Sequence, residues 1–190
     1  MTELEALNLI LAQGGNQEHV SSVESPTARG AAQELETAQK RILRRGFYFN
    51  TVTIDLTQET DGTVIIDEAT YLWVMLPDTY TIIGGKVFDL ENNTDIVSRN
   101  FTDVKAIKWL EIDEMPEVVA ERIAWEAACK YAARYKGGRS AQADYCEEQH
   151  ARAAASMSAK FPTPMNIPAG SQQSILAASA PPGFRWIELT

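Results

Sequence analysis

The stretch RGFYFNTVTIDL, residues 45–56, marks the point where the sequence changes from a helical to a strand-like pattern. Before it, small and apolar residues recur at spacings of three and four, which predicts an amphipathic helix over residues 28–45. The buried face of this helix would comprise Ala31, Leu35, Ala38 and Ile42. From residue 51 onward every second side chain is apolar, as in a half-buried strand. A helix that leads directly into strands favours a mixed fold.

Residues 47–110 continue as strand-like segments separated by turns. Apolar, β-branched or aromatic runs occupy residues 63–66, 70–76 and 79–83. Gly84-Gly85 joins the last of these runs to Lys86-Val87-Phe88, which predicts a tight hairpin because glycine readily adopts positive φ. This region is therefore predicted to form a small antiparallel sheet.

Helical patterns lie on both sides of the sheet region. They cover residues 3–13, the segment from Pro116 to the Gly137-Gly138 break, and residues 140–160. The sequence thus predicts an α+β fold. We expect a bundle of about four helices from residues 1–46 and 111–160, an inserted β-rich subdomain over residues 47–110, and an extended C-terminal arm over residues 161–190.

One face of the helix after Pro116 carries alanine at every fourth position. Small side chains at this spacing let a second helix approach closely, at the short end of the usual separation of ~8–10 Å between axes. Such a smooth face suits side-by-side packing of copies. Packing between copies is therefore assigned to Ala120, Ala124, Ala128 and Ala132.

The arm, residues 161–190, is punctuated by prolines and shows no sustained period. Aromatic and aliphatic residues in an open segment are typical of an arm that becomes ordered on a partner. The partner-binding residues would be Ile175, Leu176, Phe184, Arg185, Trp186 and Ile187. The alternative is that the arm folds back on its own domain.

The composition limits the partners of the chain. A formal net charge of -9 disfavours a protein that coats or reads nucleic acid, because an acidic surface repels phosphates, but it is compatible with a channel wall along which DNA slides. The first five residues are acidic rather than basic, and no apolar run approaches the ~20 residues that span a bilayer. Neither a signal peptide nor a membrane segment is expected. The two cysteines, Cys129 and Cys146, are interpreted as free thiols in helices.

The sequence offers little material for catalysis. His19 and His150 lie in unrelated contexts, and no metal-ligand spacing or glycine-rich phosphate loop is present. The best carboxylate pair, Asp113 and Glu114, lies at a helix start, where capping explains it; Glu147-Glu148 is interpreted as solvated. The chain is therefore predicted not to be an enzyme and to have no catalytic residues, cofactor or metal.

Five segments, taken together and in this order, carry a resemblance. They are LEALNLILA (residues 4–12), RGFYFN (45–50), LPDTY (76–80), GGKVFD (84–89) and IDEMPE (112–117). With these segments the chain resembles the tail tubular protein A family, the head-to-tail adaptors (gatekeepers) of short-tailed, podovirus-type bacteriophages. The resemblance covers about residues 3–137 and has no counterpart for the arm.

The resemblance implies a structural virion protein, made in the host bacterial cytoplasm and located in the virion tail. It implies a homo-oligomer, a dodecameric ring that joins the portal protein to the tail nozzle (tubular protein B). Double-stranded DNA would pass through the ring during ejection without sequence recognition. Two other classes stay open, namely a tail-associated glycan-degrading enzyme and a host-directed regulatory protein with one cellular partner. Assignment of the arm to the portal rests on its aromatic ending alone.

Overall fold

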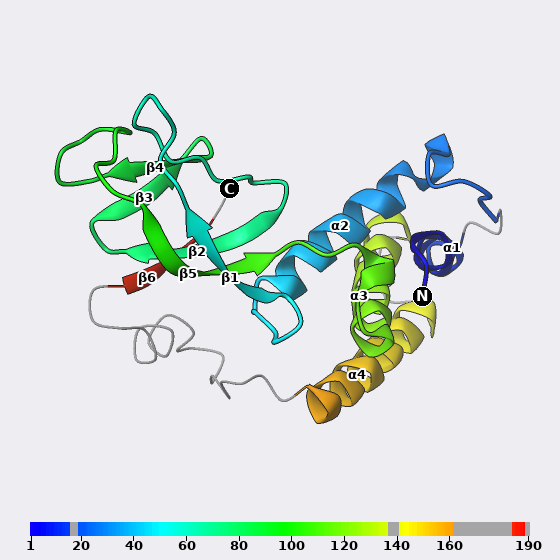
Figure 1. Cartoon of the computed structure of the whole chain (residues 1–190). Helices are drawn as coiled ribbons and strands as arrows, with labels where there is room; N and C mark the ends of the chain where they lie inside the picture. Colours follow the sequence, from blue (N-terminus) through cyan, green and yellow to red (C-terminus); the bar gives the residue numbers. More distant parts are fainter. Residues whose placement is uncertain (16–18, 137–140, 162–183, 189–190) are drawn as a thin grey trace. The chain divides into compact units, whose positions relative to one another are not determined.

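The computed structural model describes residues 1–15, 19–136, 141–161 and 184–188 (Figure 1). They fall into two compact units. A helical unit comprises the described residues of Met1–Ile42 and Leu110–Pro162, and a β unit those of Leu43–Trp109 and Thr163–Thr190. The predicted α+β fold is confirmed, with helices and a small antiparallel sheet in one chain.

The helical unit contains the four helices that the apolar periodicity predicts. Its elements are α1 (Glu3–Gln13), the 3-10 turn η1 (Pro26–Ala28), α2 (Arg29–Leu43), the 3-10 turn η2 (Ile112–Glu114), α3 (Glu117–Lys136) and α4 (Ala141–Lys160). The Thr2 hydroxyl caps α1 by accepting from the Glu5 amide at 3.2 Å, and the Glu5 carboxylate accepts from the Thr2 amide at 2.8 Å. This reciprocal capping box satisfies two donors that a helix start leaves without intrahelical partners.

Helix α3 packs against both α1 and α4. Its apolar residues Val119, Ile123, Ala127 and Tyr131 are buried, as is the predicted face of α2. On α4, the sequence favours Tyr145, Cys146, Ala153 and Met157 as the inward residues; the last three are buried, but Tyr145 is 47% exposed. The inward placement of Tyr145 was wrong because its ring lies edge-on to Trp125, 5.9 Å between centroids, at the margin of the α3–α4 contact.

The β unit contains two antiparallel sheets. The first has the strand order β1-β5-β2-β6, and the second pairs β3 with β4. The strands are β1 (Thr51–Leu56), β2 (Tyr71–Pro77), β3 (Tyr80–Ile83), β4 (Lys86–Asp89), β5 (Phe101–Lys108) and β6 (Phe184–Glu188). The run at residues 63–66, predicted as a strand, forms only isolated bridges, Gln58 with Val64 and Ile65 with Lys86.

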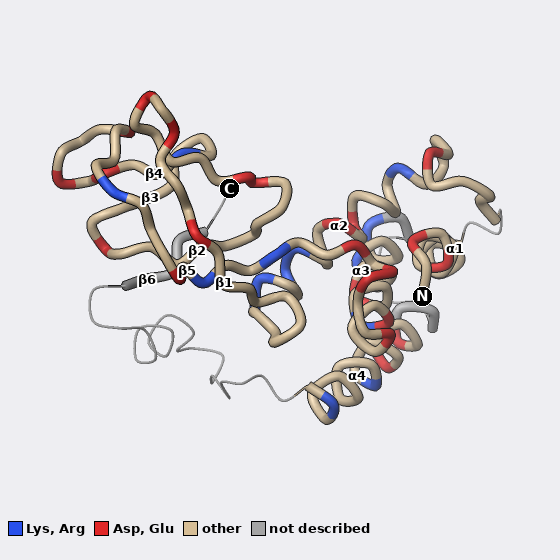
Figure 2. Tube along the Cα trace, viewed as in Figure 1, with Lys and Arg blue, Asp and Glu red and all other residues tan. Residues whose placement is uncertain are grey.

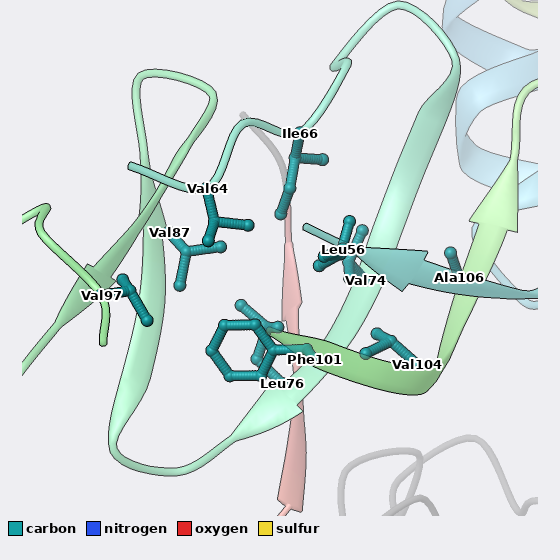
Figure 3. Close-up of a cluster of buried hydrophobic side chains, with 10 residues drawn as sticks. All are labelled: Leu56, Val64, Ile66, Val74, Leu76, Val87, Val97, Phe101, Val104 and Ala106. Atoms are coloured by element: carbon teal, nitrogen blue, oxygen red, sulfur yellow. The ribbon is translucent and has the colours of Figure 1, made fainter. Parts of the chain in front are cut away.

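The core of the β unit lies between these strands (Figure 3). Alternate residues Val74 and Leu76 of β2 point into it and are fully buried, as the period of two requires. The remaining members of the cluster are Leu56, Val64, Ile66, Val87, Val97, Phe101, Val104 and Ala106. Residues from four strands and the connecting loops thus close one hydrophobic cluster.

The hairpin between β3 and β4 has the geometry that its two glycines predict. Gly84 and Gly85 both have positive φ, +57° and +73°. Two successive residues of this kind are typical of a type I′ turn, whose twist matches that of the flanking strands. A Cβ at Gly85 would also lie 3.3 Å from the Ile66 carbonyl oxygen. The turn therefore fixes how the hairpin faces residues 65–68.

Candidate assembly surfaces

The alanine stripe of α3 is buried inside the single chain. Ala120, Ala124 and Ala128 are fully buried, and Ala132 is 4% exposed. The close approach that small residues permit is therefore used by the helical unit itself, where α3 meets α1 and α4. The assignment of this stripe to contacts between copies needs correction, because buried side chains are not available to a second chain.

The C-terminal residues divide into two groups. Ile175 and Leu176 lie outside the described residues. The residues from Phe184 to Ile187 belong to β6, whose backbone pairs antiparallel with β2, Phe184 opposite Pro77 and Trp186 opposite Met75. The backbone thus follows the alternative in which the end of the arm folds back on its own domain. Binding of a partner by these residues stays a proposal.

Two of the carboxylates weighed as catalytic candidates, Glu114 and Glu148, have structural partners. Glu114 accepts a hydrogen bond from the Glu111 amide at 3.1 Å and so caps η2. Glu148 forms an exposed ion pair with Arg152 at 2.5 Å. In the part of the chain that the structure describes, no three His, Cys, Asp or Glu side chains are grouped so as to hold a metal ion. These contacts give Glu114 and Glu148 structural roles.

A buried carboxylate joins three helices of the helical unit. The Glu126 side chain on α3 is 4% exposed and forms an ion pair with Arg41 of α2. Lys130 lies 3.4 Å from the same carboxylate, and His150 of α4 lies 3.8 Å from it. Burial lowers the pKa of His150, although the negative charge of Glu126 opposes this shift. The cluster ties α2 and α4 to α3, which is a role in the fold.

The cations at the end of α2 are likewise used within the helices. Lys40 forms an ion pair with Glu36 at 2.7 Å, one turn earlier on the same helix, and Arg41 forms the pair with Glu126. Lys40 and Arg41 thus have partners within the helices, and cations are typical of the last turns of a helix.

The loop between α2 and β1 displays an aromatic residue on a fixed backbone. Tyr48 is 69% exposed, whereas Asn50 is fully buried. The Asn50 side chain accepts from the Phe47 amide at 2.7 Å and donates to the Leu43 carbonyl at 3.0 Å. A surface tyrosine on a rigid turn is typical of binding surfaces, because little entropy is lost when it becomes covered. Residues 45–50 mark the change from helix to strand and carry part of the resemblance, but no pattern in them predicts an exposed aromatic side chain.

The hairpin β3–β4 exposes a second apolar surface. Ile83 pairs with Lys86 across the hairpin, and Ile65 forms a bridge to Lys86 from the other side. Residues directly opposite each other share a face, so these side chains lie on one face of the sheet. Ile83 is 58% exposed and Ile65 55%. The alternation that buries Val87 and partly buries Ile82 is the signal that predicts outward positions for their neighbours.

Comparison with known proteins identifies the family. The sequence profile of the family described as "Tail tubular protein" matches residues 4–164. The chain belongs to the tail tubular protein family. It is also similar to tail tubular protein A of Klebsiella phage KP34, with 26% identity over 156 residues, which cover 78% of this chain and 81% of the relative.

Membership confirms the resemblance drawn from the five sequence segments. As a tail tubular protein, the chain is a structural protein of a bacteriophage tail. Among its described residues, no helix combines the length and apolarity that a bilayer crossing requires. The match ends at residue 164, so it includes the helical unit and most of the β unit but not β6.

Proposed function

We propose that this tail tubular protein forms the adaptor ring between the portal and the tail nozzle of a short-tailed phage. The ring is dodecameric, and the double-stranded genome passes through its bore during ejection. The observation that carries the proposal is the family match along residues 4–164, together with a relative whose name is tail tubular protein A.

The charge of the chain supports a role as a conduit. A net charge of -9 gives the wall of a bore little affinity for phosphates, so DNA passes without being held. The closed cyclic assembly needs heterologous contacts, in which one surface of each copy meets a different surface of its neighbour. Two such surfaces are the loop of residues 44–50 around Tyr48 (the Tyr48 loop) and the side of the hairpin that carries Ile65 and Ile83 (the β3–β4 face).

The C-terminal residues are proposed to contact the portal. The edges of the first sheet are β1 and β6, and an edge strand presents backbone groups that a further strand can pair with. The side chains assigned to this contact are Ile175, Leu176, Phe184, Arg185, Trp186 and Ile187. Truncation after Lys160 removes both the arm and β6, so the folded state of the truncated protein must be checked by circular dichroism.

The decisive experiment is the mass of the complex formed when the chain is mixed with portal rings of the same phage. A discrete gain of a dozen copies per portal is expected from native mass spectrometry or light scattering. The protein truncated after Lys160 is expected to stay folded and to give no gain. Absence of any gain for the full chain, with both components folded, refutes the adaptor role. Binding by the truncated protein would refute only the role of the arm.

A further inference from the structure

The two exposed apolar surfaces of the β unit belong to different segments of one chain. The Tyr48 loop directly precedes β1 at Thr51. Ile65 lies near the other end of β1. Its neighbour Val64 forms a bridge to Gln58, which is two residues beyond the last residue of β1. The surfaces therefore share no residue and lie toward opposite ends of β1.

The Tyr48 loop has a basic surround. Arg45 and Lys108 are exposed, and the Lys108 amide donates to the Asn50 carbonyl at 2.7 Å, which places the end of β5 beside the loop. The Tyr48 ring is itself supported by Phe49, edge-on at 5.7 Å between centroids. The result is a rigid aromatic projection flanked by cations, and tyrosine and arginine are enriched among the residues that dominate binding energy.

The β3–β4 face has an acidic surround. Figure 2 shows Asp and Glu along the loops that flank β3 and β4. Asp67 and Glu68 are exposed, and the Glu68 carboxylate lies beside the Gly85 turn. Hydrogen bonds from Thr70 and the Ala69 amide hold the pKa of Asp67 below its usual range, so this rim stays charged at neutral pH. Lys86, which lies on this face between Ile65 and Ile83, is paired with Asp95 at 3.3 Å.

The two surfaces are complementary in charge, and both have an apolar centre. An apolar patch with an acidic rim fits an aromatic projection with a basic surround, and like-charged alternatives are disfavoured at such contacts. A contact between two unlike surfaces of identical copies is heterologous, and its repetition closes into a ring or continues as a filament. The burial of the alanine stripe removes the competing candidate for this contact.

We propose that the Tyr48 loop of one copy docks on the β3–β4 face, at Ile65 and Ile83, of the next copy in the ring. Arg45 and Lys108 then lie against the rim formed by Asp67 and Glu68. The inference rests on the proposed ring, and it assigns the contact between neighbouring copies to the β unit.

Cysteine cross-linking tests the contact directly. Single variants Tyr48→Cys and Ile83→Cys are mixed, and the double variant is prepared separately, each treated with a short bis-maleimide with and without portal rings. The mixture is expected to give a cross-linked dimer, and the double variant a ladder of multimers. Each single variant alone is expected to stay monomeric, which also controls for the native thiols. Tyr145→Cys combined with Ile83→Cys is the matched control, since Tyr145 is an exposed tyrosine of the helical unit.

Charge reversal provides the second arm. Arg45→Glu is expected to abolish the ladder, and Glu68→Lys in the same chain is expected to restore it. These exposed positions leave the fold intact, so loss of the ladder reports the contact and not unfolding.

The outcomes separate this contact from the adaptor role. A portal complex of full mass without the ladder overturns the contact and leaves the adaptor role standing. A ladder without any gain of mass on the portal supports the contact and refutes the adaptor role. A dimer from Tyr48→Cys alone, or an equal ladder from the Tyr145 control, overturns the contact.

Discussion

Replacement of Asn50 by alanine tests whether a single buried amide fixes the Tyr48 loop. The Asn50 side chain makes hydrogen bonds of 2.7 Å from the Phe47 amide, 3.0 Å to the Leu43 carbonyl and 3.4 Å to the Lys108 carbonyl. Alanine removes all of them. The Leu43 carbonyl keeps the Gly46 amide as a donor at 3.0 Å, so the largest penalty falls on the buried Phe47 N–H.

The expected loss of stability follows from these contacts. A buried donor without an acceptor costs about 1–3 kcal/mol, and each ordinary hydrogen bond contributes about 1 kcal/mol. Asn50→Ala should therefore lower the free energy of unfolding of the β unit by about 2–4 kcal/mol. Asn100→Ala is the matched control, because Asn100 is exposed and accepts one bond, from the Gln58 amide at 2.8 Å. Its loss should stay below about 1 kcal/mol.

The measurement is urea unfolding followed by tryptophan fluorescence and far-UV circular dichroism. Asn50→Asp adds a pH signature, because it keeps the acceptor for Phe47 but turns a carboxylate toward two carbonyl oxygens. The introduced carboxyl has a raised pKa in the folded state, so its penalty should grow as the pH rises and shrink on acidification. If Asn50→Ala is no more harmful than Asn100→Ala, the amide does not hold the turn and the reasoning fails.

Three further predictions concern the helical unit. Arg41→Ala leaves the buried Glu126 carboxylate with weaker partners and should lower the free energy of unfolding by about 1–3 kcal/mol, measured in urea. Lys40→Ala removes only an exposed ion pair and should lower it by less than about 0.5 kcal/mol. Equal losses for the two variants would contradict the role of Arg41. Burial lowers the pKa of His150 in the folded state, so the folded chain binds a proton there less readily than the unfolded chain. The free energy of unfolding should therefore fall as the pH drops below the histidine pKa of the unfolded chain, about 6.5. His150→Gln should lessen that fall in thermal unfolding scans, and an unchanged pH profile would argue against it. A hydrogen bond to the neighbouring thiol and burial raise the pKa of Cys129, so its reaction with a thiol reagent at pH 8 should be slower than that of an unfolded control peptide.

The helices were predictable because their periodicity survives in the packing. The faces of α1 and α2 are buried where apolar residues recur every three or four positions. The failure at Tyr145 has a physical reason, since α4 is rich in alanine and its apolar stripe is weak. With a weak stripe, the sequence does not determine which large residue turns inward.

Strand β5 was not identified because its pattern changes phase. Its buried residues are Phe101, Val104, Ala106 and Ile107, which is not a period of two. Asp103 has a positive φ of 56°, and its amide donates to the Asp55 carboxylate at 2.9 Å. This irregularity coincides with the shift in register between β1 and β5, so the alternation that would have marked the strand is broken.

The alanine stripe shows what periodicity leaves undecided. Small residues at every fourth position predict a close helix–helix contact, and that contact exists. The pattern is the same whether the second helix belongs to the same chain or to another copy. Burial of the stripe in the single chain shows that the contact is made within one copy. No single residue or spacing in the sequence predicts that burial.

Burial of the stripe has a consequence for assembly. Contacts between copies must use side chains exposed in the single chain, and in the β unit these are isolated apolar residues such as Tyr48, Ile65 and Ile83. Each fully covered side chain contributes about 1.5–3 kcal/mol, while association costs at least about 4 kcal/mol of translational and rotational freedom. One such contact leaves little surplus, so copies in solution should be largely monomeric. A portal ring that holds neighbours side by side makes each contact effectively intramolecular, and the cross-linked ladder should therefore increase sharply when portal rings are added.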